Sequence, residues 1–324
     1  MSLRARNLML STVFDLMGRD ENSATFAIGW AIEQCYEFRW MLLESVADVS
    51  ISRGDEFTVD LQRHAEDGGY TDIEVRVPNK CHVIVEAKKG WSLPQRKQLN
   101  RYIDRFRDDV LETRRFVSIS AASEEYARRN QEYDLAGIIC THRSWKDARL
   151  LVEEAQRLTK PASEKLWLRQ LASHLREYEF MNRIHDNQVF VVSLGTQPIA
   201  SGEPYNWIDV VTQDNSYFHP VGNRWPLDPP NYIAFRYFGQ LQSVHHIDAY
   251  KVIADVSTIN PKWPQTEIDH FVYSLGPAMR PPREVKSGPM WNNRVLCAID
   301  TLLSGQYATV MDAMNETKRR EASE

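Results

Sequence analysis

Cysteine is scarce in this chain, with four among 324 residues: Cys35, Cys81, Cys140 and Cys297. They form no C-x-x-C pair and no cluster with histidine, which argues against a structural zinc site and against a disulfide framework. Free cysteines of this kind are typical of a reducing compartment. We therefore expect a cytoplasmic protein.

Long apolar runs and a strong charge of either sign are also lacking. No apolar stretch approaches the roughly 18 residues that cross a bilayer, and residues 1–30 lack the pattern of a secretion signal. The formal net charge is -5, so nucleic acid would have to bind to a local basic patch rather than to the whole surface. We expect no membrane partner.

The first part of the chain predicts alternating helices and strands. Dense apolar residues over 23–46 predict one buried helix, and alternation around Val59 predicts a first strand. Apolar residues at spacings of three and four predict an amphipathic helix over 94–110. Further elements are predicted at 116–121 (strand), 123–130 (helix), 135–141 (strand), 144–157 (helix) and 162–181 (helix). The strand, helix, strand passage favours parallel pairing through a crossover.

The composition shifts after about residue 186, where prolines and aromatic residues become frequent. Short strand-like runs occur at 188–194, 207–212, 232–237 and 250–255. Such runs between turn-rich loops are typical of a small β-rich sandwich or barrel. The tail 313–324 is expected to be frayed. We predict two domains, 1–185 and 186–324, the second with a recognition or regulatory role.

Between these regions, two predicted strands carry charged residues to one edge. In Tyr70–Val77 apolar residues alternate with Asp72, Glu74 and Arg76. After a turn, the apolar strand from Cys81 ends in Glu86-Ala87-Lys88. Side chains alternate across a strand, so Glu86 and Lys88 share a face. Charges at the end of a buried strand are costly to desolvate unless they have a use.

Phosphodiester hydrolysis is one such use. It requires carboxylates that hold a hard cation, an activated water, and positive charge near the phosphate. The sequences GYTD (69–72), VIVEAK (83–88) and QLNRY (98–102) together resemble the PD-(D/E)xK nuclease superfamily. The resemblance covers roughly residues 20–141. It implies an α/β fold with a restriction-endonuclease-like core, a mixed central sheet flanked by helices, to which the C-terminal β-rich domain is added.

The resemblance assigns roles to individual residues. Asp72, Glu86 and the Ala87 carbonyl would bind Mg²⁺ or Mn²⁺, and Lys88 would position the water or stabilise the developing charge. Gln98 would support the site. Thr71 stands where the motif name has proline.

An additional acid near the first helix is also implied. Glu21 fits best, and Glu33 is its rival. Glu21 could equally well be an acidic residue at the start of the helix, favoured by the helix dipole.

Basic residues around the motif are candidates for contact with nucleic acid. They are Lys89, Arg96, Lys97 and Arg101, with Tyr102 one turn beyond Gln98. Interleaved acidic residues make an ordinary solvated face an alternative for this helix. As alternatives, Asp72 could cap a turn, Glu74 and Arg76 on its face could be ordinary solvated residues, and Glu86 with Lys88 could be a simple surface ion pair. His245 and His246 are adjacent in a predicted strand, so a shared metal is not expected.

The function implied is a metal-dependent endonuclease acting on DNA in preference to RNA, suited to defence against foreign DNA. Many nucleases of this fold form homodimers, and this chain could do the same. The alternative is a non-catalytic module that binds nucleic acid or a partner on a nuclease-like scaffold. In the second domain, 232–237 and 241–252 loosely resemble modules of the PUA or EVE kind, which bind RNA or modified bases.

Overall fold

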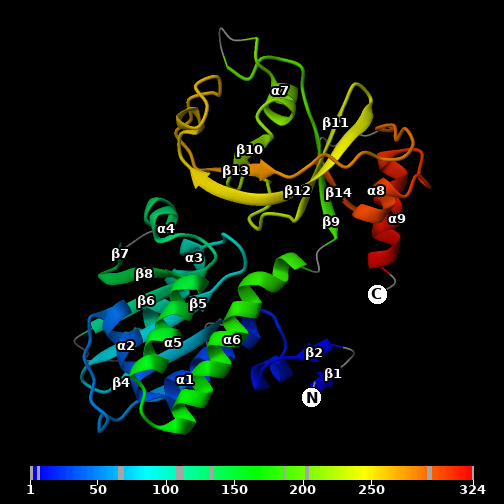
Figure 1. Ribbon diagram of the computed structural model, residues 1–324. Helices are drawn as coiled ribbons and strands as arrows, with labels where there is room; N and C mark the ends of the chain where they lie inside the picture. The colour runs from blue at the N-terminus through cyan, green and yellow to red at the C-terminus, as the bar shows by residue number, and fades with distance from the viewer. Residues whose placement is uncertain are drawn as a thin grey trace. The chain divides into compact units, whose positions relative to one another are not determined.

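The computed structural model divides the chain into two compact units, Met1–Met181 and Asn182–Glu324. Figure 1 shows the elements of each. The residues described are 3–5, 8–64, 69–106, 113–131, 134–184, 187–200, 204–289 and 294–322. The predicted domain boundary, between residues 185 and 186, lies outside these ranges.

Unit 1 is built on a mixed six-stranded sheet in the order β3-β4-β5-β6-β8-β7. The strands are β3 (Thr58–His64), β4 (Tyr70–Val77), β5 (Cys81–Ala87), β6 (Thr113–Ser120), β7 (Asp134–Leu135) and β8 (Ile138–Ser144). β5, β6 and β8 are parallel, whereas β3, β4 and β7 pair antiparallel with their neighbours. The predicted mixed central sheet is confirmed.

Helices cover both faces of this sheet (Figure 1). They are α1 (Glu21–Gln34), α2 (Tyr36–Ala47), α3 (Arg96–Tyr102), α4 (Glu124–Asn130), α5 (Trp145–Leu158) and α6 (Ala162–Ile184). The larger core packs α1, α2, α5 and α6 against apolar residues of β4, β5 and β6. A smaller core on the other face packs α3 and the 3-10 helix η2 (Ile103–Phe106). A short hairpin, β1 (Leu3–Ala5) with β2 (Leu8–Leu10), and η1 (Val13–Met17) precede α1.

Two predicted elements of unit 1 are wrong in their boundaries. The helix over 23–46 is two helices, because Cys35 is extended and Arg39 donates to the carbonyls of Ile32 and Glu33 at 2.7 and 3.0 Å, capping α1. The strand over 135–141 is two antiparallel strands joined at Ala136 and Gly137, both with positive φ. The predicted end of the 94–110 helix lies outside the described residues.

Unit 2 contains a second six-stranded sheet, in the order β10-β13-β12-β11-β9-β14. Its strands are β9 (Gln188–Ser193), β10 (Ser216–Pro220), β11 (Tyr232–Tyr237), β12 (Gln240–Ile253), β13 (His270–Leu275) and β14 (Arg294–Ala298). Only β9 and β11 pair in parallel among these strands. Over the described part of unit 2, β10 and β14 lie at the two ends of this strand order, and the long β12 pairs with β11 along its first part and with β13 along its second. The β-rich character of the second unit is confirmed.

Three helices and a 3-10 turn complete unit 2 as described: α7 (Trp207–Thr212), α8 (Ile299–Leu303), α9 (Val310–Glu321) and η3 (Val256–Thr258). The predicted strand at 207–212 is wrong, because Asn206 and Asp209 form a capping box that starts a helix there. The predicted frayed tail is also wrong. α9 begins at the cap Thr309 and buries Val310 and Ala313 against the sheet.

No helix in the described ranges is long and apolar enough to cross a membrane.

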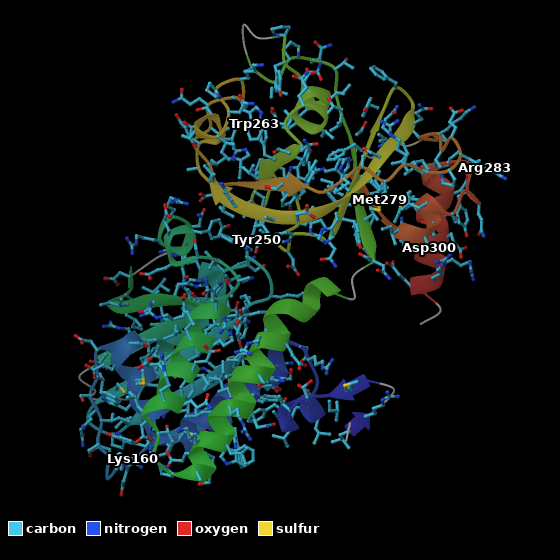
Figure 2. All side chains as sticks on the ribbon, in the orientation of Figure 1. Lys160, Tyr250, Trp263, Met279, Arg283 and Asp300 are labelled. Carbon is cyan, nitrogen blue, oxygen red and sulfur yellow. The ribbon has the colours of Figure 1, made fainter. Side chains whose placement is uncertain are left out.

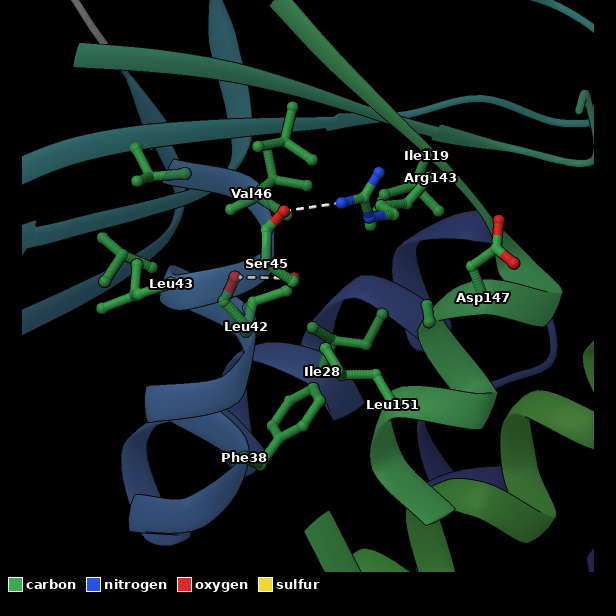
Figure 3. A pocket seen from close by; sticks show the side chains of 15 residues that line it. Ile28, Phe38, Leu42, Leu43, Ser45, Val46, Ile119, Arg143, Asp147 and Leu151 are labelled. Atoms are coloured by element: carbon green, nitrogen blue, oxygen red, sulfur yellow. Dashed lines mark hydrogen bonds between the residues drawn. The ribbon is translucent and has the colours of Figure 1, made fainter. Parts of the chain in front are cut away.

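A cavity of about 80 Å³ lies within the larger core of unit 1, between the sheet and helices α1, α2 and α5 (Figure 3). Aliphatic side chains such as Leu43 and Val83 form most of its wall. On one side Arg143 donates to the Ser45 carbonyl at 2.5 Å. Such a void has lost dispersion contacts that a slightly larger side chain could restore.

Filling this cavity should stabilise unit 1. Val83→Ile adds one methylene, and we expect a gain of up to about 1 kcal/mol in the free energy of unfolding. Val77 is equally buried but does not border the cavity, so Val77→Ile should instead destabilise by about 1–3 kcal/mol through overpacking. Hydrogen exchange of the β4 and β5 amides reports on this unit alone. Equal effects of the two substitutions would contradict the prediction.

Candidate active site

The β4–β5 hairpin brings Asp72 and Glu86 to the same end of the sheet. Ile73 pairs with Val85 in the antiparallel register, and continuing it by one residue sets Asp72 opposite Glu86. The Ala87 N–H donates to Asp72 Oδ2 at 2.7 Å. β5 is buried along its whole length. Two carboxylates from adjacent strands therefore meet where a central strand ends.

Glu86 is 4% exposed and contacts three polar side chains. Lys88 Nζ lies 2.5 Å from Oε1, and Gln98 Nε2 also donates to Oε1. The Tyr102 hydroxyl lies 3.3 Å from Oε2, but it donates its proton to the Tyr70 carbonyl at 2.6 Å. A hydroxyl has one proton, so Oε2 receives little from Tyr102. A protonated Glu86 could itself donate to that hydroxyl.

The two carboxylates raise each other's electrostatic cost. Burial, together with the charge of Asp72, raises the pKa of Glu86 to about 7, against the opposing effect of Lys88. Burial also raises the pKa of Asp72, although the Ala87 N–H and Lys88 oppose this. Tyr102 has its pKa raised to about 12 by burial and by Glu86. One lysine does not neutralise this pair of acids.

Lys88 is held at the site through its backbone. Its N–H donates to the Ile119 carbonyl at 2.7 Å, and its carbonyl accepts from Trp145 Nε1 at 3.3 Å. The Lys88 side chain is partly exposed, at 24%. β6 and the start of α5 thus fix the residue after β5, while the charged group remains accessible.

Glu21 lies beside these residues, whereas its rival Glu33 is exposed and contacts Gln34. The Lys89 backbone N–H donates to Glu21, and both Lys88 and Asp72 influence its charge. Burial is the main reason that the pKa of Glu21 is raised. The structure therefore brings a third acid to the margin of the site from the first turn of α1.

The basic candidates lie on the surface around this group. Arg96, Lys97 and Arg101 are exposed on α3, and Lys89 is exposed after the end of β5. Tyr102, in contrast, is buried at 1% exposure. Its hydroxyl is engaged inside the protein, so the expectation that Tyr102 contacts nucleic acid is not favoured by its position.

The alternative that Glu74 is an ordinary solvated residue is wrong. Its side chain is fully buried, with His82 Nε2 at 2.7 Å, Arg76 at 2.8 Å and Arg105 at 3.5 Å. Burial opposes the charge, but His82 and Arg76 lower the pKa of Glu74 to about 2. β4 is paired on both sides, and Arg105 covers Glu74 on this face, so Glu74 is not at the surface.

Arg105 extends this network toward the site and was missed by reasoning from the sequence. It donates to the Gly69 carbonyl at 2.8 Å and lies near Thr71 Oγ1 at 3.4 Å. Together with the bond from Tyr102 to the Tyr70 carbonyl, it holds the backbone that leads into Asp72. The sequence did contain an indication of this contact: Arg105 follows Tyr102 by three residues, which places both on the same side of a helix.

The donor set fits a hard divalent cation. Within the described ranges, no group of three or more His, Cys, Asp or Glu side chains is placed to hold a metal ion. Two carboxylates completed by a main-chain carbonyl, waters and phosphate oxygens are, however, the usual way in which Mg²⁺ is bound. Burial raises the pKa of both Asp72 and Glu86, and the charge of Asp72 raises that of Glu86 further; a bound cation would offset both effects.

No family model, curated protein or solved structure matches this chain.

Glu86 and Glu74 should affect stability with opposite signs. A carboxyl whose pKa is higher when folded loses its stabilising effect as the pH rises, here from 4.5 to about 7. Glu86→Gln should therefore stabilise unit 1 at pH 8, by about 1–3 kcal/mol, and change little at pH 4. Glu74 has a pKa lowered from 4.5 to about 2, so its stabilisation is complete above that range and is lost as the pH falls through it.

Glu74→Gln should accordingly destabilise unit 1 at neutral pH, by about 3–5 kcal/mol, because it removes the charged partner of the buried Arg105 and of the half-buried Arg76. Hydrogen exchange of the β4 and β5 amides at pH 8, with unfolding midpoints at both pH values, measures the difference. Glu56→Gln is the control, since Glu56 is exposed. A loss of stability in Glu86→Gln at pH 8 would contradict the assignment of excess charge.

Proposed function

We propose that this chain is a metal-dependent endonuclease with a restriction-endonuclease-like core, acting on DNA in preference to RNA. The observation that carries the proposal is the pair of carboxylates formed by the half-buried Asp72 and the buried Glu86, whose raised pKa values are only partly offset by Lys88. An uncompensated pair of this kind at a strand end is costly without a ligand. A divalent cation such as Mg²⁺ or Mn²⁺ is the ligand that its oxygen donors suit.

In this proposal, Asp72, Glu86 and the Ala87 carbonyl hold the cation. When bound, the cation supplies positive charge to the phosphate and lowers the pKa of a bound water. Asp72 is fixed for this role by the Ala87 N–H, at 2.7 Å from Oδ2. Gln98 keeps Glu86 in place from α3. Glu21, at the margin, is suited to hold water or a further cation.

Lys88 contributes the mobile positive charge of the site. Its ammonium is bonded to Glu86 and remains partly exposed, so it can turn toward a phosphate oxygen or the attacking water. It would stabilise negative charge that develops on the phosphate as the bond to the leaving oxygen breaks. Its backbone is anchored by Ile119 and Trp145, which limits the movement to the side chain.

The order of elements supports the likeness to the PD-(D/E)xK superfamily. Helices α1 and α2 are followed by the meander β3–β5, then α3, β6, α4 and β8. This is close to the helix, three strands, helix, strand order that the motifs led us to expect. In the proposal, unit 2 selects the target, in the manner of PUA or EVE modules. A homodimer would allow both strands of foreign DNA to be cut.

The alternative is a non-catalytic module that binds nucleic acid or a partner. It is favoured by one observation: Lys88 and Gln98 both bond to Glu86 Oε1, and Tyr102 lies near Oε2. A carboxylate surrounded in this way could be a purely structural group. The two functions differ in whether substitution of Lys88 changes cleavage separately from binding.

Cleavage should require a divalent cation, the two carboxylates of the site and the ammonium of Lys88. With plasmid DNA and Mn²⁺, we expect Asp72→Asn, Glu86→Gln and Lys88→Met each to lower the cleavage rate by at least about 100-fold, and a chelator to abolish it. Lys88→Met should retain Mn²⁺ binding measured by calorimetry, whereas Glu86→Gln should lose it. Asp60→Asn, on an edge strand, is the control. Cleavage that survives the Glu86 and Lys88 substitutions would refute the site; DNA binding without any cleavage supports the module.

The exposed basic residues of α3 should contribute sequence-independent contacts with phosphates. Each contact adds about 0.9 to the slope of log affinity against log salt concentration. Lys97→Ala with Arg101→Ala should therefore reduce that slope by roughly 2 for double-stranded DNA, with chelator present to prevent cleavage. Arg157→Ala with Lys165→Ala, on α5 and α6, removes the same charge elsewhere in unit 1 and should leave the slope unchanged. An unchanged slope in the α3 variant would contradict the prediction, because DNA would then bind to another part of the surface.

A further inference from the structure

Residues 280–284 of unit 2 form an arch, a loop that bulges out from the segment paired with strand β12. At one foot, Met279 and Val244 exchange backbone hydrogen bonds of 2.8 Å, and at the other Leu241 N–H donates to the Val285 carbonyl at 2.8 Å. Along β12, Leu241 and Val244 are three residues apart. Along the opposing segment, Met279 and Val285 are six residues apart. The three additional residues have no strand position opposite them and must bulge away. The firm attachment at both feet makes the arch a fixed feature.

A pocket of about 500 Å³ lies at this arch. The end of α7, with Thr212, contributes to its wall, and Tyr237 contributes an aromatic ring from β11. Pro281 and Pro282 belong to the arch side, where their fixed φ angles stiffen the wall. Pockets of roughly 300–1,000 Å³ are those that bind small molecules and cofactors. This pocket has the right size and a rigid frame.

The pocket wall also carries polar groups that are available to a ligand. His245 Nδ1 lies 2.9 Å from the Gly276 carbonyl and must donate to it, so Nε2 accepts from the Ser243 hydroxyl at 2.9 Å. The Ser243 oxygen then remains available as an acceptor. Gln242 donates its amide nitrogen to the Tyr237 carbonyl at 3.0 Å, which leaves its amide oxygen as another acceptor. A ligand with N–H or O–H groups is matched by these atoms.

The same pocket carries two arginines of the arch, Arg280 and Arg283, both exposed. In Figure 2, Met279 marks a foot of the arch and Arg283 lies on the segment beyond it. Neither arginine forms an ion pair with a residue in the described ranges, and Glu284 is the acid beside them. Guanidinium groups bind phosphate through paired N–H donors. An anionic group on the ligand would therefore be held at the arch.

We propose that this pocket binds a nucleotide. Arg280 and Arg283 bind its phosphate, the Ser243 and Gln242 oxygens accept hydrogen bonds from its base or sugar, and Tyr237 packs beside the base. Inorganic phosphate alone would leave the acceptors and the ring without partners, and an apolar ligand would leave the arginines unused. The nucleotide can be free or part of a single strand. The proposal does not depend on cleavage by unit 1.

Binding to the full chain tests this directly, with chelator present so that unit 1 cannot cut. Calorimetry would compare AMP, GMP, CMP and dTMP with the matching nucleosides and with inorganic phosphate. We expect at least one nucleoside monophosphate to bind with one-to-one stoichiometry. Arg280→Ala with Arg283→Ala should weaken it by at least about tenfold, and Lys251→Ala with Lys262→Ala, which removes the same charge outside the pocket, should not. Because both arginines are exposed, the variant should fold normally.

Two further comparisons sharpen the outcome. The matching nucleoside and inorganic phosphate should each bind more weakly than the nucleotide, and Ser243→Ala should weaken nucleotide binding without affecting the phosphate. A short single-stranded oligonucleotide that binds more tightly than the mononucleotide, and depends on the two arginines, would identify a strand as the source; weaker binding would identify a free nucleotide. The proposal is overturned if no mononucleotide binds, if phosphate alone binds as well, or if the arginine variant is unaffected.

Discussion

Repulsion between the half-buried carboxylate of Asp72 and the buried carboxylate of Glu86 is the constraint around which unit 1 is arranged. Burial raises both pKa values, the charge of Asp72 raises the pKa of Glu86 further, and Lys88 opposes these shifts only in part. Glu74, two residues from Asp72, shows the contrast. It is fully buried but has four cationic or imidazole partners, His82, Arg63, Arg76 and Arg105, and its pKa is lowered to about 2. One acid is neutralised by the protein, and the other pair is not, which is why the pair is the candidate for binding a cation.

The surrounding elements limit how this charged pair can move. Gln98 and Tyr102 approach Glu86 from α3, and the Lys88 backbone is bonded to β6 and α5. Arg105 and Tyr102 fix the carbonyls of Gly69 and Tyr70 just before Asp72. Contacts from four separate elements therefore converge on two strand ends. Rigid support of this kind is what a preorganised site for hydrolysis requires.

Unit 2 uses its backbone differently. Its sheet is continuous through the long β12, but the opposing segment has more residues than the strand positions available, and the surplus forms the arch of residues 280–284. His245 illustrates how little of this was visible beforehand. The sequence indicated that His245 and His246 lie on opposite faces, and the structure agrees, with His245 buried at 5% and His246 exposed. The bond from Ser243 to His245 and the pocket that they border depend on where residues 276–285 return.

The sequence by itself determined the elements with strong periodicity and the charged residues that end β5. Alternation in Tyr70–Val77 and the apolar run before Glu86 define strands because burial of one side chain in two, or of every one, leaves a local pattern. Local capping decided against the pattern at 207–212, where Asn206 and Asp209 start a helix. The burial of Glu74, the contact of Arg105 with Gly69 and the place of Glu21 beside Lys89 were decided only by tertiary structure. Each of these depends on which segment packs against a given strand. That packing joins residues that are distant in the chain, so no local sequence pattern indicates it.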